Sequence, residues 1–297
     1  MSQTKMRTLD DVDVTAYGIS DTETTNSKKN DILDKLCQVM RGEGVVRLVL
    51  TGSDAGYIRV WDLNSQKATV VLQGRQEKVY VVLHLSGSIL AAGTESGIVF
   101  WDFIKFPEKP IKYLRCHTSF VTSLIKMRNG DLISGAGVRD GSIRVWKYPE
   151  HETAIELKGD TTSGIKCLVA INDDMIASGS DGVASAVRVW NLLTYECIHV
   201  LKGHDGNINC LCYTSRGELL SGGDDYDIRV WDIETGECQR VISSQQGWVY
   251  SLTENRDGYV LSCGQYNRLI AVWDASTGKC VKSLSLQHRG NFLHNTK

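Results

Sequence analysis

Short runs of apolar residues, separated by turns rich in Gly, Asp and Asn, recur along most of the chain. One stretch shows the pattern clearly, with the runs NINCLCYT (207–214), ELLSGG (218–223), DIRVWD (227–232) and ECQRVI (237–242). These runs are rich in Val, Ile, Leu and aromatic residues, and their lengths are typical of strands. We therefore predict four short strands in this stretch. Apolar residues occur on both faces of these predicted strands, as expected for a sheet whose two faces pack on neighbouring sheets.

The stretch belongs to a repeat with a nearly constant period. Six similar segments, among them TGSDAGYIRVWD (51–62) and SGGDDYDIRVWD (221–232), each contain a tryptophan near their end. The tryptophans lie 40, 45, 44, 41 and 42 residues apart and are Trp61, Trp101, Trp146, Trp190, Trp231 and Trp273. Such a period, with a turn and a strand ending in Trp-Asp, is typical of propeller arrays. Over residues 35–286 the chain resembles the WD40-repeat family. The resemblance implies an all-β, WD40-type β-propeller with six clear repeats.

The number of blades is left open by the sequence. Outside the six repeats lie 34 residues at the start and 11 at the end, which together equal one more repeat. The tail LQHRGNFLHN (286–295) parallels KGHDGNINCL (202–211), so the tail and residues 6–19 can form a composite seventh blade. In a second arrangement residues 1–34 stay outside a six-bladed ring, and in a third a partner completes an open ring. We divide the chain into an N-terminal segment, 1–34, that can complete the last blade, and a propeller domain, 35–297.

The resemblance also implies a hydrogen-bonded set within a blade, built from a His, a strand Ser, a turn Asp and the Trp. Two repeats match it, with His204, Ser221, Asp225 and Trp231 in one and His117, Ser134, Asp140 and Trp146 in the other. A Ser–His–Asp combination also suggests a hydrolase. The structural interpretation is favoured because the spacing follows the repeat and no GxSxG nucleophile turn is present. Other repeats depart from the set, and the last has Gln245 at the His position. We expect those blades to depend more on apolar packing.

Composition narrows the functional classes. The net charge of −2 gives no overall attraction to nucleic acid or to an anionic membrane. Nine cysteines, an odd number with no CxxC pair, predict reduced, largely buried thiols and no metal site. No run of 18 apolar residues and no signal peptide are found, so we expect a cytoplasmic protein, with the nucleus left open. No cofactor motif is present, and none is expected.

The repeat also predicts which residues form the propeller face. Residues beside the first apolar position of each inner strand, or before the turn that precedes the Trp, are expected to lie there. Trp248 stands out because it lies outside the Trp-Asp series, although it could instead cap the core between two blades. The partner-binding candidates are Trp248, Tyr80, Phe120, Tyr250, Tyr266, Arg139, Lys78, Asn207, Asp54 and Asp224.

These observations favour a protein-interaction scaffold that binds a peptide or protein on the propeller face, without catalysis, nucleic acid, membrane or small-molecule substrate. One alternative is an enzyme with its site in the central channel. The inner strands offer only His84 and Glu254 for such chemistry. Another alternative is a subunit whose partner completes the open propeller.

Overall fold

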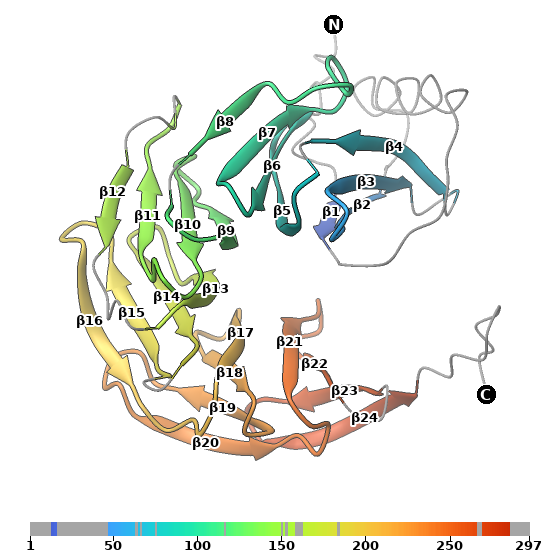
Figure 1. Cartoon of the computed structure of the whole chain (residues 1–297). Coiled ribbons are helices and arrows are strands. Elements are labelled where there is room, and N and C mark those ends of the chain that lie inside the picture. The colour runs from blue at the N-terminus through green and yellow to red at the C-terminus, as the bar shows by residue number, and fades with distance from the viewer. Residues whose placement is uncertain are drawn as a thin grey trace, which may run out of the picture. The chain divides into compact units, whose positions relative to one another are not determined.

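A computed structural model describes residues 13–16, 47–62, 65, 67–74, 76–115, 117–149, 151, 154–157, 163–182, 185–265 and 269–285. All regular structure in these residues is β-strand, and the strands form six four-stranded sheets (Figure 1). The all-β fold predicted from the sequence is therefore confirmed.

In each sheet the strands follow chain order. The first sheet contains β1 (Asp13–Ala16), β2 (Arg47–Gly52), β3 (Tyr57–Asp62) and β4 (Lys67–Gln73). The second contains β5 (Val79–Ser86), β6 (Ile89–Thr94), β7 (Ile98–Asp102) and β8 (Lys112–Leu114). The third contains β9 (Val121–Lys126), β10 (Leu132–Ala136), β11 (Ile143–Trp146) and β12 (Ala154–Leu157).

The remaining sheets follow the same order. The fourth contains β13 (Ile165–Ala170), β14 (Met175–Ser180), β15 (Val187–Asn191) and β16 (Glu196–Leu201). The fifth contains β17 (Ile208–Tyr213), β18 (Leu219–Gly223), β19 (Asp227–Trp231) and β20 (Cys238–Ser243). The sixth contains β21 (Val249–Glu254), β22 (Val260–Gly264), β23 (Leu269–Asp274) and β24 (Lys279–Ser285).

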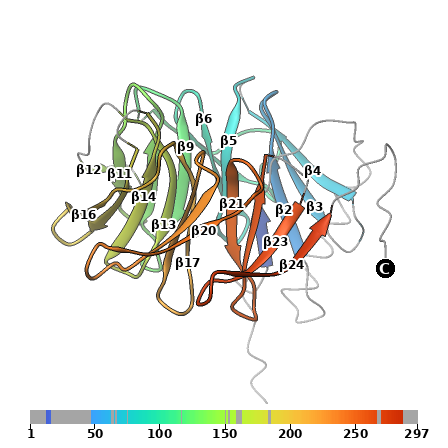
Figure 2. The same cartoon turned by 90° about the horizontal axis from the view of Figure 1, so that it is seen from below.

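The chain divides into two compact units. Unit 1 holds the described residues up to Lys126 with 130–133, 146–149 and 151, and unit 2 holds the remaining described residues. Within unit 2, β17 packs between β13 and β21, so the fifth sheet lies between the fourth and the sixth (Figures 1 and 2). Buried apolar side chains fill the space between these sheets, among them Ile208, Ile228, Val230 and Val249.

The first sheet differs from the others at its inner edge. β1 pairs with β2 in parallel, from Asp13 opposite Arg47 to Ala16 opposite Leu50, whereas the other registered strand pairs are antiparallel. Residues 13–16, which the sequence analysis offered to a composite seventh blade, are therefore hydrogen-bonded to the first sheet. The tail 286–297 lies outside the described residues, so the seventh blade stays a prediction.

The repeated Trp joins the two central strands of its sheet. The Trp231 indole Nε1–H donates to Ser221 Oγ at 2.7 Å, and equivalent bonds link Trp61 to Thr51, Trp190 to Ser178 and Trp273 to Ser262. The second sheet has Ala92 at the acceptor position, and the buried Trp101 Nε1 has no hydrogen-bond partner in the described residues.

The Asp or Asn after the Trp closes the next turn. Asp232 Oδ1 accepts from the backbone N–H groups of Glu234 and Thr235 at 2.8 and 3.2 Å. These backbone bonds hold the pKa of Asp232 below its ordinary value, because they stabilise the ionised form. The Trp-Asp pair thus fastens one end of the third strand to the sheet and to the turn that follows.

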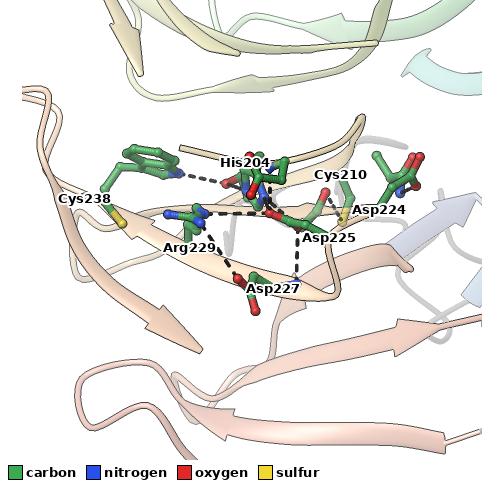
Figure 3. A network of polar contacts seen from close by, with 12 residues as sticks. His204, Cys210, Asp224, Asp225, Asp227, Arg229 and Cys238 are labelled. Atoms are coloured by element: carbon green, nitrogen blue, oxygen red, sulfur yellow. Dashed lines mark hydrogen bonds and ion pairs between the residues drawn. The ribbon is translucent and has the colours of Figure 1, made fainter. Parts of the chain in front are cut away.

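In the fifth sheet the Trp bond extends into a longer chain of contacts (Figure 3). Ser221 Oγ donates to His204 Nε2 at 2.6 Å, and His204 Nδ1 donates to the Asp225 carboxylate at 2.8 Å. Asp225 also accepts from the backbone N–H groups of Asp205 and Asp227. Burial raises the pKa of Asp225, but the bonds from His204 and the backbone outweigh it and lower the pKa.

The sixth sheet corrects one expectation. Gln246, rather than Gln245, takes the place of the His: its side-chain oxygen accepts from Ser262 Oγ, and its Nε2 donates to the Leu269 carbonyl at 2.9 Å. The turn before Val249 is one residue shorter than the turn before Ile208, which shifts the position. This sheet therefore keeps a buried polar network at Gln246, and the prediction that Gln245 holds the His position is wrong.

The matching third repeat is described in part. Ser134 and Trp146 are buried, and His117 is half-buried. Asp140 Oδ1 accepts from the backbone N–H of Ser142 at 3.1 Å and from its hydroxyl.

The described cysteines are free thiols, but fewer are buried than predicted. Cys210 and Cys212 are buried, whereas Cys197, Cys238 and Cys280 are exposed. The three exposed thiols share one position, opposite the Trp on the outermost strand of their sheets. Side chains on these outer strands have no neighbouring strand beyond them in the sheet, which explains the exposure.

Ala92→Ser is expected to stabilise the protein by about 0.5–1.5 kcal/mol, because a serine hydroxyl can accept the unpaired Trp101 indole N–H. The free energy of unfolding from urea titration measures the gain. Ala91→Ser, equally buried on the opposite face of β6, is the control and should give no gain. Equal effects of the two substitutions would contradict the role assigned to position 92.

Asp225→Ala should lower the free energy of unfolding by roughly 1–3 kcal/mol, because it leaves buried donors unpaired. Asp225→Asn should lose less, since the amide oxygen still accepts from His204. The lowered pKa means that ionised Asp225 stabilises the fold at neutral pH and that this contribution is lost as the pH falls through the lowered value. Denaturation at neutral and acidic pH tests both points. Identical curves for wild type and Asp225→Ala would contradict the network.

Iodoacetamide should modify Cys197, Cys238 and Cys280 in the native protein, and Cys210 and Cys212 only after unfolding. Burial raises the pKa of Cys212 to about 11, so the reactive thiolate is scarce as well as shielded. Peptide mapping under non-reducing conditions gives the order of labelling. A disulfide such as Cys197–Cys238 would contradict the prediction of free thiols.

Candidate functional site

The inner strands share one irregularity at their starts. β5, β13, β17 and β21 each begin with a buried apolar residue, and the pairing register with the next strand skips the residue that follows it. The skipped residues are Tyr80, Lys166, Asn209 and Tyr250. A β-bulge takes its extra residue out of the ladder and turns the side chain away from the sheet. These four sheets therefore present one side chain each at equivalent places.

Close packing beneath the bulges makes these positions rigid. A Cβ on Gly222, opposite Cys210, would lie 2.5 Å from Val249 Cγ1 of the next sheet. A Cβ on Gly179 would lie 2.5 Å from Cys167 Sγ and 2.6 Å from Ile208 Cγ2. Real Cβ atoms do not come this close, so glycine lets the second strand of one sheet approach the inner strand of the next sheet in this way.

Four of the predicted partner-binding residues form one chain of contacts in unit 1. Asp54 Oδ1 lies 2.9 Å from Lys78 Nζ, and Lys78 Nζ lies 5.5 Å from the centre of the Tyr80 ring. The Tyr80 ring stacks on Phe120, with ring centres 4.8 Å apart and planes 17° from parallel. We call Asp54, Lys78, Tyr80 and Phe120 the unit 1 cluster. It combines an ion pair with a flat aromatic surface.

Charge states in the unit 1 cluster follow from these contacts. The hydrogen bond to Asp54 raises the pKa of Lys78, with burial acting in the opposite direction. Partial burial and the nearby Glu95 carboxylate raise the pKa of Tyr80. With both pKa values raised, Lys78 is charged and Tyr80 is neutral at physiological pH, so the two side chains form a cation–π contact.

Two further candidates form an aromatic pair in unit 2. Trp248 and Tyr250 lie on either side of the buried Val249, and their rings meet edge to face with centres 6.3 Å apart. Trp248 is 37% exposed and Tyr250 47% exposed. The Trp248 carbonyl accepts from the Gln265 backbone N–H at 2.9 Å, which fixes the main chain beneath the exposed rings. Trp248 therefore does not lie in the core as a cap between two sheets.

Polar candidates in unit 2 lie in a separate network. Asp224 accepts from Asn207 Nδ2 at 2.9 Å and from Asn209 Nδ2 at 2.7 Å, and Lys166 Nζ donates to Asn209 Oδ1 (Figure 3 shows Asp224 beside the fifth-sheet set). Asn207 Oδ1 accepts from the Gly182 backbone N–H at 2.9 Å. The network links the fourth and fifth sheets of unit 2.

Sequence reasoning selected Asn207 and Asp224 but missed Lys166 and Asn209. The signal was available, because both occupy the position that Tyr80 and Tyr250 occupy in their own repeats. Of the other candidates, Arg139 is exposed and has a φ of 98°, in the turn between β10 and β11. Tyr266 lies outside the described residues.

The resemblance of Ser221, His204 and Asp225 to a hydrolase triad is geometrical only. Ser221 has an exposed fraction of 0%, and its oxygen accepts the indole N–H of Trp231 while its hydroxyl donates to His204. A substrate carbonyl cannot reach that oxygen, so the geometry favours the structural role.

The two ionisable groups named for channel chemistry also have local partners. His84 Nε2 lies 2.8 Å from the Gly87 carbonyl oxygen, and the Glu254 carboxylate accepts from the backbone and hydroxyl of Ser215. Across the described residues, no group of three or more His, Cys, Asp or Glu side chains is placed to hold a metal ion. The same residues include no helix long and apolar enough to cross a membrane.

Comparison with known proteins agrees with this architecture. The model of the WD domain, G-beta repeat, matches residues 108–147, 195–232 and 236–274. An uncharacterized WD repeat-containing protein of Schizosaccharomyces pombe is 26% identical over 59% of this chain and 52% of its own length. WD repeat-containing protein pop2 of the same organism is 26% identical over 56% of this chain and 27% of its own length.

Two further matches extend the comparison. Autophagy-related protein 16 of Arabidopsis thaliana is 26% identical over 64% of this chain and 38% of its own length. The chain thus spans about half or less of these relatives. The crystal structure of the computationally designed Ika8 protein superposes with a TM-score of 0.65 and 27% identity, covering 82% of this chain and 72% of that one. Three stretches of the chain are therefore WD40 repeats, its curated relatives are WD repeat proteins, and its fold resembles a designed β-propeller. Proteins with WD40 repeats generally serve as protein-interaction scaffolds.

Proposed function

We propose that this protein is a non-catalytic scaffold that binds a peptide or protein partner through the exposed residues at the starts of its inner strands. The observation that carries the proposal is the set of bulges that turn Tyr80 and Tyr250 out of the sheet, beside Phe120 and Trp248. Aromatic side chains of this kind supply most of the binding energy in many protein interfaces.

The physical logic is preorganisation. The rings are already stacked or in edge-to-face contact, and their main chain is held by strand pairing, so binding costs little conformational entropy. Asp54 and Lys78 add charged groups beside the rings of unit 1, and Asp224 adds a carboxylate in the separate polar network of unit 2. Such polar groups orient a partner and exclude wrong ones, while the aromatic contacts provide affinity.

An enzyme is less well supported. Catalysis would need ionisable groups that converge on a space open to substrate, and the described candidates His84 and Glu254 are each bound to a turn of the protein. The completion of an open propeller by a partner concerns residues outside those described and remains an alternative.

Trp248→Ala and Tyr250→Ala should remove a specific set of proteins from an affinity purification quantified by mass spectrometry. Truncating a hot-spot aromatic costs about 2 kcal/mol or more, which weakens binding roughly thirtyfold. The unit 1 double variant Tyr80→Ala/Phe120→Ala tests the other aromatic surface in the same way.

Tyr259→Ala is the matched control. Tyr259 is 37% exposed, as Trp248 is, but it precedes β22 and so lies at the opposite end of the β21–β22 pair. The control should retain the proteins that Trp248→Ala loses. If every variant, folded by thermal melting, retains the same proteins as wild type, the proposed face is wrong.

A further inference from the structure

A second surface lies on the outer edge of the second sheet, away from the inner strands. It comprises the loop from Phe103 to Pro110 and the outermost strand β8 (Figure 1). Residues 103–115, FIKFPEKPIKYLR, contain four cationic residues and one acidic residue, although the whole chain has a net charge of −2. The positive charge of this segment is therefore a local feature.

The loop is held in place by its own contacts. Asp102 Oδ1 accepts from the backbone N–H groups of Ile104 and Lys105 at 3.2 and 2.9 Å. The Phe106 N–H donates to the Asp102 carbonyl at 3.0 Å, and the Ile111 N–H donates to the Phe100 carbonyl at 2.8 Å. Phe103 is buried in the core of unit 1. The surface is therefore already formed before any partner binds.

Large apolar side chains remain exposed on this ordered segment. Phe106 is 49% exposed, Ile111 45% and Tyr113 42%. Because side chains alternate along a strand, Ile111, Tyr113 and Arg115 point to the same side of β8 and its continuation. With the exposed Lys105 and Lys109 of the loop, they form what we call the basic-aromatic patch: Lys105, Phe106, Lys109, Ile111, Tyr113 and Arg115.

Tyr113 and Arg115 also border a shallow pocket with Ser96, Ile98 and Val99. Gly97 makes this arrangement possible: its φ is +142°, and a Cβ there would lie 2.1 Å from the Leu114 carbonyl oxygen. The end of β8 can therefore lie directly against the start of β7. A cationic residue and an aromatic residue that border the same pocket suit a partner that offers a carboxylate beside an apolar side chain.

Three other described outer strands expose apolar side chains without this combination. β24 has the exposed Lys279 and Lys282 beside Val281 and Leu284, but no aromatic residue. β16 exposes Ile198 and Val200 but carries Glu196 and no Lys or Arg. β20 exposes Val241, while its one cation, Arg240, donates to the Ala275 carbonyl. The combination of aromatic surface and positive charge thus distinguishes the edge at β8.

We propose that the basic-aromatic patch binds an acidic, apolar-containing segment of a protein partner. The cations Lys105, Lys109 and Arg115 would pair with its carboxylates, and Phe106, Ile111 and Tyr113 would contact its apolar side chains. A lipid surface fits less well. Membrane-bound segments bury apolar side chains about 5–10 Å deep, and these side chains are less than half exposed and lie close to the protein surface.

The test is a subtractive selection from a random-peptide phage library. Clones are kept when they bind the wild-type protein and fail to bind the Lys105→Glu/Lys109→Glu variant. Lys202→Glu/Lys279→Glu changes the net charge equally at exposed lysines in unit 2 and is the control. The retained clones should be rich in Asp and Glu with interspersed apolar residues.

A synthetic peptide from the most enriched clone is then titrated by fluorescence anisotropy. Its Kd should weaken at least tenfold in Lys105→Glu/Lys109→Glu and in Tyr113→Ser, and stay within twofold in the control. Trp248→Ala should not change it, which separates this proposal from the inner-strand face. Failure to recover such clones, recovery of neutral or basic clones, or loss only of phosphatidylserine-vesicle or RNA binding in the patch variant would overturn the proposal.

Discussion

The hydrogen bond from a Trp indole to a Ser or Thr hydroxyl is the interaction on which the rest of the first, fourth, fifth and sixth sheets depends. It joins the second and third strands at a site closed to water, where an unpaired N–H costs about 1–3 kcal/mol. In the fifth sheet the same hydroxyl donates to His204, and through it reaches Asp225 and the turn before the third strand. One buried donor thus determines the placement of two strands and a turn.

The residues that stabilise a sheet therefore differ from the residues that it offers for binding. The Trp, its acceptor and the turn Asp are directed into the sheet and leave little freedom for change. The bulged residue at the start of the inner strand is outside the ladder, and the chain has Tyr80, Lys166, Asn209 and Tyr250 at this place. A position that differs in chemistry from sheet to sheet on a constant support is suited to selecting partners.

The sixth sheet shows how a network can persist when its consensus residue is lost. Gln246 accepts from Ser262 Oγ with its amide oxygen and donates its amide N–H to the Leu269 carbonyl. It thus supplies one acceptor and one donor, as His204 does in the fifth sheet. A fixed spacing between repeats predicts Gln245 at the His position. It does not account for the turn before Val249, which is one residue shorter than the turn before Ile208. The buried hydroxyl needs an acceptor, whichever neighbouring residue supplies it.

The resemblance to WD40 repeats implied the fifth-sheet set. The sequence by itself determined the strands, the six repeats, the Trp-Asp positions and all four residues of the unit 1 cluster. These follow from local alternation, turn chemistry and a period that every repeat shares. Only the tertiary structure decided that Asp54, Lys78, Tyr80 and Phe120 touch one another, that β1 pairs with β2 in parallel, and that Lys166 joins Asn209. Such contacts connect residues from different sheets or from distant parts of the chain. Neighbouring sheets approach closely at Gly52 and Gly93 in unit 1 and at Gly179 in unit 2, and no local pattern in the sequence encodes that distance.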